Sequence, residues 1–260
     1  ELQLFASTEL RGIEDDVLAA ADSNIVKTYL AFKESLSDKK FLEPQETCAD
    51  YYYQLLSKET QLQRLHSSMR RNYAAALQDD AQQELNRMLK SGLTEQILKN
   101  AKSSDSYKNY PAYIERAARL LGENHYMYPI LQARKYYFKA YIQKERKQRY
   151  SVFKQAMHWQ KDMPHAMVEL IRNTHPNQLD SANFYFQKAT DLVPSWVEPY
   201  LALGDYYYSN LQPQKTEEML KLAGEIDSTS VLVWYKKANF YKIRRNYKES
   251  EKWYLKTINS

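Results

Sequence analysis

Histidine and cysteine are the residue types in this chain best suited to hold a metal or to act as a nucleophile. The sequence has one cysteine, Cys48, and five histidines, which are His66, His125, His158, His165 and His175. No two histidines stand four residues apart with a Glu between them, the arrangement that holds zinc on the helix of a metalloprotease. His158 and His165 lie two helical turns apart, but Pro164 breaks a helix between them. We therefore expect no metal site.

The sequence supports nucleophilic or acid–base chemistry no better than it supports a metal site. Cys48 has no histidine near it in the sequence that would activate its thiol. The adjacent acids Asp15-Asp16 and Asp79-Asp80 stand at the ends of predicted helices, where helix capping explains a carboxylate. The five glycines are isolated, so no glycine-rich loop is present to bind a phosphate. We expect no catalytic activity and no cofactor.

The composition indicates a folded chain built from long elements. Only five Gly and eight Pro occur in 260 residues, so turns are few. The hydrophobic class makes up 43% of the chain, which is enough for a core and argues against wholesale disorder. The 23 tyrosines suit stacked helices, because a tyrosine ring fills the groove between helices while its hydroxyl reaches water.

Charge and hydropathy exclude several classes of partner. The net charge of +5 is mild and well mixed, and the one dense basic cluster, 139–149, is interpreted as a solvated helix end. We therefore expect no nucleic-acid partner. No apolar run reaches the roughly 18 residues of a membrane span. Because the chain begins with Glu1 rather than Met, we interpret it as a piece of a longer protein, which leaves the compartment open.

Residues 178–260 repeat their residue types at a step of 34. In each copy, large side chains stand at positions 4, 11 and 24, and small ones at positions 8, 20 and 27. The last copy places Trp234, Ala238, Tyr241, Ser250, Tyr254 and Thr257 there, and the copy before it Tyr200, Gly204, Tyr207, Thr216, Leu220 and Ala223. Small residues let two helices approach closely while large ones fill the gaps. We expect one helix near positions 2 to 14 and a second near positions 17 to 30.

The same register continues towards the N-terminus. The small residue at position 27 recurs at Ala117, Ala156, Ala189, Ala223 and Thr257, with spacings of 39, 33, 34 and 34. Chance does not readily produce such a regular series, so residues 106–260 are expected to form about four helical hairpins.

Three sets of residues carry a family resemblance: Leu203-Gly204 with Tyr207, Ala182 with Phe186 and Ala189 closing on Pro194, and Trp234 with Ala238 and Tyr241. The pattern resembles the tetratricopeptide repeat family. The resemblance is closest over 178–260, extends less regularly over 108–177 and is absent before about 105. Lys237 stands where the family prefers an apolar residue, and Ser228 where it prefers Pro.

The resemblance implies an all-α fold, a right-handed solenoid of antiparallel helix pairs. It also implies that the first helices line a concave face which binds a protein or peptide without catalysis. By register, the residues of this face would be Arg134, Tyr137, Phe138, Arg172, His175, Leu201, Asp205, Tyr208, Tyr235, Asn239, Lys242 and Ile243. This mixture of aromatic and cationic groups predicts an extended ligand with apolar side chains and some negative charge.

Residues 1–105 have helical spacing but no 34-residue register, so we expect a separate helical N-terminal region. Within it, residues 1–11 are expected to be extended, Asn24 to cap a helix and Pro44 to open the next one. Residues 60–89 are expected to form one long helix, or two with a break near Asp79-Asp80.

Two functions remain open at this stage. The chain is expected to be a non-catalytic scaffold that binds proteins or peptides. Alternatively, it is the C-terminal accessory or regulatory module of a larger enzyme, such as a peptidase or kinase, whose catalytic domain lies before residue 1. Since the repeat ends inside a second helix at Ser260, we expect Trp253, Tyr254 and Ile258 to be partly uncovered. We also expect either that the next element has been removed or that this end docks on another copy or a partner.

Overall fold

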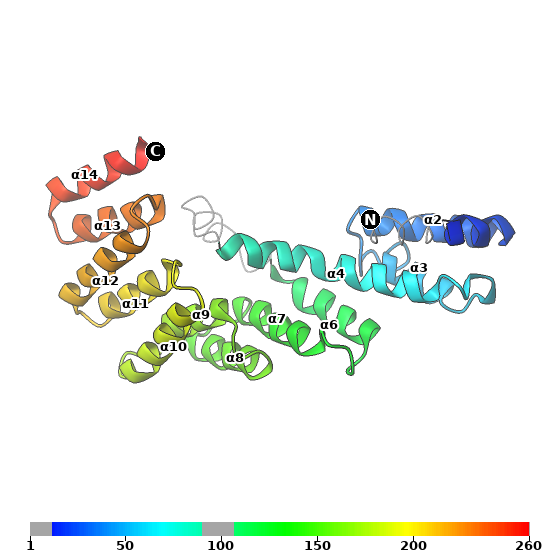
Figure 1. Ribbon diagram of the computed structural model, residues 1–260, viewed down its shortest axis with the longest axis horizontal. Coiled ribbons are helices and arrows are strands. Elements are labelled where there is room, and N and C mark those ends of the chain that lie inside the picture. The colour runs from blue at the N-terminus through cyan, green and yellow to red at the C-terminus, as the bar shows by residue number, and fades with distance from the viewer. Residues whose placement is uncertain (1–11, 90–106, 260) are drawn as a thin grey trace. The chain divides into compact units, whose positions relative to one another are not determined.

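The computed structural model describes residues 12–89 and 107–259 (Figure 1). All regular secondary structure in these ranges is helical, which confirms the all-α prediction. The described residues divide into two compact units. Unit 1 holds 12–81 and 112–131, and unit 2 holds 82–89, 107–111 and 132–259. The expected extended start at 1–11 lies outside the described residues.

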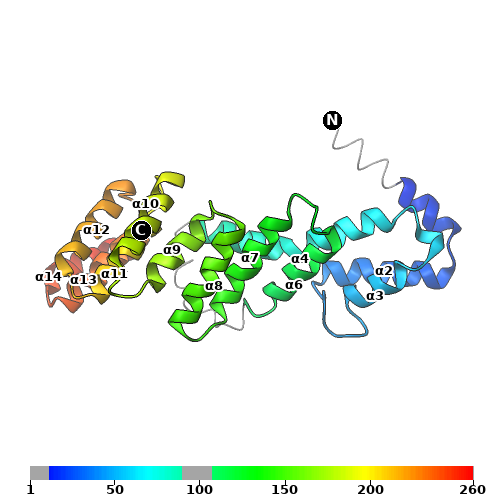
Figure 2. The same cartoon turned by 90° about the horizontal axis from the view of Figure 1, so that it is seen from below.

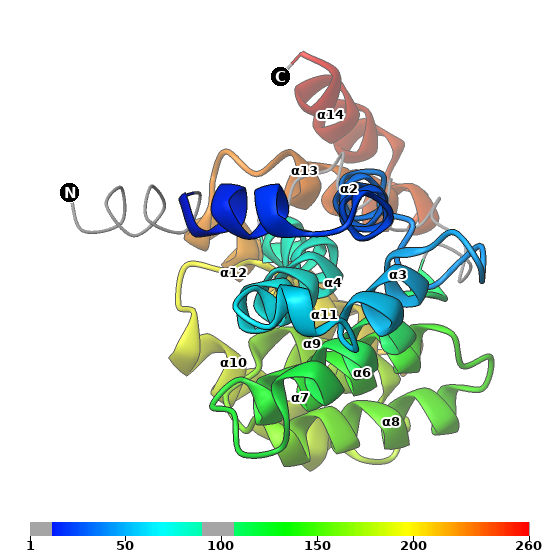
Figure 3. The ribbon, with the colours of Figure 1, turned by 90° about the vertical axis from the view of Figure 1, so that its right-hand side faces the viewer.

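Unit 1 contains a helix at 12–20, α2 (Ser23–Ser37), α3 (Ala49–Leu56), the short 3₁₀ helix η1 (Thr60–Leu62), most of α4 (His66–Leu89) and α6 (Tyr110–Leu121). Helices α2 and α3 pack side by side (Figure 3). The core includes Phe32, Leu56 and Tyr73, whose side chains are at most 2% exposed. The Phe32 and Tyr73 rings meet edge to face with their centroids 5.9 Å apart, a favoured aromatic geometry.

A partly buried polar contact joins three segments of unit 1. The Tyr73 hydroxyl on α4 donates to Asp50 Oδ1 at 3.1 Å, and the Arg116 guanidinium on α6 donates to the same oxygen at 2.5 Å. The Tyr73 hydroxyl also lies 3.2 Å from the Phe41 carbonyl oxygen. Since a charged acceptor strengthens hydrogen bonds, this contact fixes α3 against α4 and α6.

Two local predictions for this region were wrong. The residue before α2 is Asp22, two positions ahead of the expected cap Asn24. Pro44 follows a cis peptide bond in a turn, and the next helix begins only at Ala49. For residues 60–89, the structure supports the alternative of a continuous helix, because α4 runs from His66 without a break through Asp79-Asp80, and Asp80 forms an ion pair with Lys39 at 2.6 Å.

Unit 2 contains eight consecutive helices after α6. They are α7 (Tyr128–Tyr141, mostly in this unit), α8 (Arg146–Trp159), α9 (Pro164–Asn173), α10 (Leu179–Leu192), α11 (Glu198–Ser209), α12 (Pro213–Ile226), α13 (Val231–Ile243) and α14 (Tyr247–Ile258). Neighbours along the chain from α8 to α14 pack on one another, and α9 also packs on α11 (Figure 2). Each helix pair therefore buries its apolar faces against the next pair.

The helix starts follow the 34-residue step. Helices α10, α12 and α14 begin at Leu179, Pro213 and Tyr247, each 34 residues after the last. These starts agree with the expected second helices, and α11 and α13 occupy the places of expected first helices. The periodic pattern therefore placed the helices of this region correctly.

The small residues of the repeat lie where two helices touch. The Thr216 hydroxyl on α12 donates to the Gly204 carbonyl on α11 at 3.4 Å, and the Ser250 hydroxyl on α14 donates to the Ala238 carbonyl on α13 at 3.0 Å. A Cβ added at Gly204 would meet Met219 Cβ at 3.4 Å, so a small residue is needed there. The same hydroxyl-to-carbonyl bond therefore joins the two helices in both pairs.

Candidate functional site

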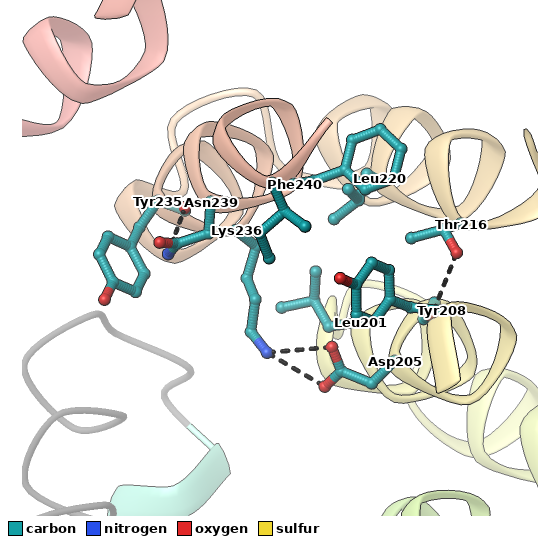
Figure 4. Close-up of a pocket in the computed structure, with 11 residues that line it drawn as sticks. Leu201, Asp205, Tyr208, Thr216, Leu220, Tyr235, Lys236, Asn239 and Phe240 are labelled. Carbon is teal, nitrogen blue, oxygen red and sulfur yellow. Dashed lines mark hydrogen bonds and ion pairs between the residues drawn. The ribbon is translucent and has the colours of Figure 1, made fainter. Parts of the chain in front are cut away.

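An open pocket lies among α11, α12 and α13 of unit 2, and its volume is about 230 Å³ (Figure 4). Its lining consists of Leu201, Gly204, Asp205, Tyr208, Thr216, Leu220, Tyr235, Lys236, Asn239, Phe240 and Ile243. The apolar side chains of Leu201, Leu220 and Phe240 are almost fully buried and form its inner wall. Ile243 is 60% exposed and stands where a ligand can reach it.

Six residues that the sequence predicted for the concave face line this pocket. Leu201, Asp205 and Tyr208 come from α11, and Tyr235, Asn239 and Ile243 come from α13. The two helices are the first helices of successive pairs. The structure thus brings these predicted residues together.

One ion pair joins the two helices at the pocket. The Lys236 ammonium on α13 lies 3.0 Å from Asp205 Oδ2 and 3.2 Å from Oδ1 on α11 (Figure 4). The Asp205 side chain is 46% exposed and that of Lys236 is 24% exposed. Because water reaches both groups, the pair stabilises the fold by at most about 1 kcal/mol. A ligand carboxylate can therefore share the ammonium at small cost.

Asn239 is fixed by bonds within the chain. Its amide nitrogen donates to the Tyr235 carbonyl at 3.0 Å, and its side-chain oxygen accepts from the Tyr254 hydroxyl at 2.8 Å. Tyr208, in contrast, is 40% exposed at the pocket. The amide is thus held in one orientation, while the phenol ring of Tyr208 offers an accessible aromatic surface.

Two further predicted residues lie in the core of unit 2. Tyr137 and Phe138 on α7 are 1% and 0% exposed. The Phe138 ring packs on Tyr107 and Tyr110 at centroid distances of 5.8 and 4.7 Å. The Tyr137 hydroxyl lies 3.0 Å from that of Tyr141, and burial raises the pKa of Tyr137 well above its ordinary value. In this structure both side chains support the fold and present no surface to a ligand.

Arg172 on α9 binds two buried carboxylates. Its guanidinium donates to Glu169 on the same helix at 3.0 Å and to Glu198 on α11. The side chains of Glu169 and Glu198 are only 9% and 8% exposed. Burial lowers the pKa of Arg172, but Glu198, Glu169 and Asp205 outweigh burial and hold that pKa well above its ordinary value. Arg172 therefore connects α9 to α11 instead of standing free.

The remaining predicted residues lie outside the pocket lining. Arg134 on α7 is half-buried, and burial lowers the pKa of its guanidinium. Lys242 on α13 and His175 after α9 are exposed. Whether any of them contacts a partner stays a prediction.

Sequence reasoning missed Lys236. It stands one position after Tyr235 in the repeat, and only its pairing with Asp205, 31 residues away, places it in the pocket. Helical spacing predicts the face of a helix on which a residue lies. It does not predict that a long side chain, such as that of Lys236, reaches a carboxylate on a neighbouring helix.

The basic segment 139–149 is not simply a solvated surface. Arg146 on α8 donates to the carbonyls of Arg172, Asn173 and Thr174 at the end of α9. Arg149 donates to Asn173 Oδ1 at 3.0 Å. Arg146 therefore binds the backbone carbonyls at a helix C-terminus, where positive charge is favoured, and Arg149 binds a side chain at the same helix end.

Helix α14 presents several apolar groups to solvent. Tyr247, Leu255 and Ile258 are 66%, 51% and 76% exposed. These values agree with the expected incomplete cover of the last helix, while self-association through α14 stays a prediction that light scattering can test.

No model of a known protein family matches the chain, and a search of curated proteins found no significant match. Among residues 12–89 and 107–259, no group of three His, Cys, Asp or Glu side chains is arranged to hold a metal. Over the same ranges, every helix is too short or too polar to cross a lipid bilayer.

Proposed function

We propose that this chain is a non-catalytic scaffold, a right-handed solenoid of tetratricopeptide-like helix pairs that binds an extended peptide on its first helices. The observation that carries the proposal is the pocket between α11 and α13. Residues chosen from the repeat register alone, among them Asp205, Tyr208 and Asn239, line this single opening. The regular 34-residue step of the helix starts supports the same architecture.

The size of the pocket favours a peptide side chain as its occupant. Cofactors and drug-sized ligands usually occupy about 300–1,000 Å³, and this pocket holds about 230 Å³. One apolar side chain, such as leucine or phenylalanine, would contact Leu201, Leu220 and Phe240 on the inner wall. Burying such a side chain contributes about 1.5–3 kcal/mol to binding.

The charges at the rim favour a carboxylate next to that apolar side chain. Lys236 is the cation at the pocket, and its ammonium already holds the carboxylate of Asp205. A ligand carboxylate would share this ammonium, and Tyr208 would pack on the peptide backbone. The preferred ligand is therefore an extended segment with one apolar and one acidic side chain close together.

A library of random peptides displayed on phage tests the proposal. The whole chain is used for selection, and the selected peptides are then measured by fluorescence polarisation. We expect enrichment of a short motif that pairs an apolar residue with Asp or Glu.

Two matched variants separate the pocket from the rest of unit 2. Ile243→Glu places a carboxylate at the pocket, whereas Ile258→Glu makes the same change at the exposed end of α14. We expect Ile243→Glu to weaken binding of the selected peptides at least about tenfold, or 1.4 kcal/mol. Ile258→Glu should leave it unchanged. Failure to select any motif, or equal binding by both variants, would show that this pocket is not a peptide site.

A further inference from the structure

Lys237 is the residue at which the repeat departs from its apolar pattern, and the structure packs its side chain against neighbouring helices. It lies on α13, is half-buried, and lines a surface hollow of about 430 Å³ between α12, α13 and α14. This hollow lies apart from the proposed peptide pocket and shares only Leu220 with it.

A glycine on the neighbouring helix makes room for the amine. A Cβ built at Gly224 of α12 would lie 2.7 Å from Lys237 Nζ and 3.6 Å from its Cε. Such a separation is too short for contact between a carbon and an ammonium. The end of the Lys237 side chain therefore lies directly against the backbone of α12, and any larger residue at 224 would displace it.

Three ammonium groups gather around one indole ring. The Nζ atoms of Lys237, Lys252 and Lys256 lie 4.5, 5.4 and 5.5 Å from the centre of the Trp253 ring. The ring attracts each cation, but it supplies no countercharge. The like charges repel one another, so the cluster favours loss of a proton from its most buried member.

Three carboxylates around the hollow are already bound to other groups. Glu249 pairs with Lys252 at 3.1 Å, Glu225 with Lys221 at 3.8 Å, and Glu217 accepts from the Tyr241 hydroxyl at 2.6 Å. Glu218 also lines the hollow, and no carboxylate within the described part of the chain lies within ion-pair distance of Lys237.

The protonation of Lys237 follows from this environment. Burial lowers the pKa of the Lys237 ammonium, Lys256 and Lys252 lower it further, and Glu225 opposes them only in part. A larger fraction of this amine is therefore neutral, and hence nucleophilic, near neutral pH.

We infer that Lys237 is a selective acylation site that accepts acyl groups from negatively charged activated donors, such as acyl phosphates. The lysine nitrogen forms a bond to the acyl carbon, and the bond from that carbon to the phosphate oxygen breaks. The proton lost by the amine is released with the phosphate. Lys252 and Lys256 attract the anionic leaving group, and the resulting amide removes one positive charge from the crowded cluster.

Acetyl phosphate is the probe that tests this inference. The intact chain is incubated with it at pH 7.5, and acetylation at each lysine is followed by mass spectrometry. Lys248 on α14 is exposed and serves as the internal reference. We expect Lys237 to react at least about threefold faster than Lys248, because burial and the neighbouring ammonium groups lower the pKa of Lys237 and so raise its neutral fraction.

Two variants connect that rate to the geometry. Gly224→Ala should push the Lys237 amine into solvent and reduce its rate to that of Lys248, and alanine is the better helix former, so α12 is retained. Lys256→Gln removes a repelling charge from an exposed position and should also slow Lys237. Circular dichroism confirms that both variants are folded. A Lys237 rate no greater than that of Lys248, or one that Lys256→Gln leaves unchanged, would overturn the inference.

Discussion

Replacing Arg172 by methionine should destabilise unit 2 strongly. Methionine retains most of the length of the arginine side chain but lacks its charge, so the loss comes chiefly from the ion pairs with Glu169 and Glu198. Both carboxylates would remain buried without their cation. Breaking a buried ion pair by removing one partner costs about 3–5 kcal/mol, and here one arginine serves two acids.

The loss should be recovered in part when one of the two acids is also neutralised. In Arg172→Met/Glu198→Gln, the carboxylate that faced Arg172 from α11 is neutral as well, and the amide that replaces it can still accept or donate hydrogen bonds. We expect the double variant to be more stable than Arg172→Met by about 1–2 kcal/mol, since residues in one network do not act additively.

Tryptophan fluorescence during urea unfolding measures this effect selectively. The four tryptophans of the chain, Trp159, Trp196, Trp234 and Trp253, all lie in unit 2. Arg244→Met is the matched control, because Arg244 is exposed and such changes usually alter stability by less than about 0.5 kcal/mol. If Arg172→Met costs less than about 1 kcal/mol, the buried ion pairs do not hold α9 to α11 and the reasoning is wrong.

Three further changes test other parts of the structure. Tyr73→Phe removes the hydroxyl that donates to Asp50 and should cost unit 1 about 1–3 kcal/mol in thermal unfolding followed by circular dichroism; no change would contradict the role of this bond. Ser250→Leu places a larger side chain against the Ala238 carbonyl and should cost about 1–3 kcal/mol by overpacking, whereas the exposed Leu255→Ser should have little effect in the same urea titration. Burial, aided by Tyr150, raises the pKa of Tyr185 to about 12, so the folded state keeps a proton that the unfolded state loses above about pH 10. Stability should therefore fall between about pH 10 and 12, and Tyr185→Phe should remove on the order of 1 kcal/mol of that fall, as measured by urea unfolding at pH 9 and pH 11.

The helices of unit 2 could be located from the sequence because their packing is periodic and local. A small residue must recur wherever two helices touch, as at Gly204 and Ala238, and this requirement repeats with every pair. The helix starts at Leu179, Pro213 and Tyr247 followed the pattern for that reason. No such repeated requirement exists before residue 105, where Asn24 and Pro44 were misassigned because caps and turns depend on contacts with distant segments.

The sequence by itself determined the all-α class, the 34-residue step and the face of α11 and α13 on which Asp205, Tyr208 and Asn239 lie. In an α-helix, the spacing of residues along the chain determines the direction in which each side chain points, so residues of one face can be assigned without coordinates. Only the tertiary structure decided which of the predicted residues are accessible. Phe138 is covered by Tyr107 and Tyr110, and Arg172 is bound by Glu198. The same holds for the end of Lys237, which lies against Gly224 of another helix, because burial and ion pairing depend on what other segments place against a residue.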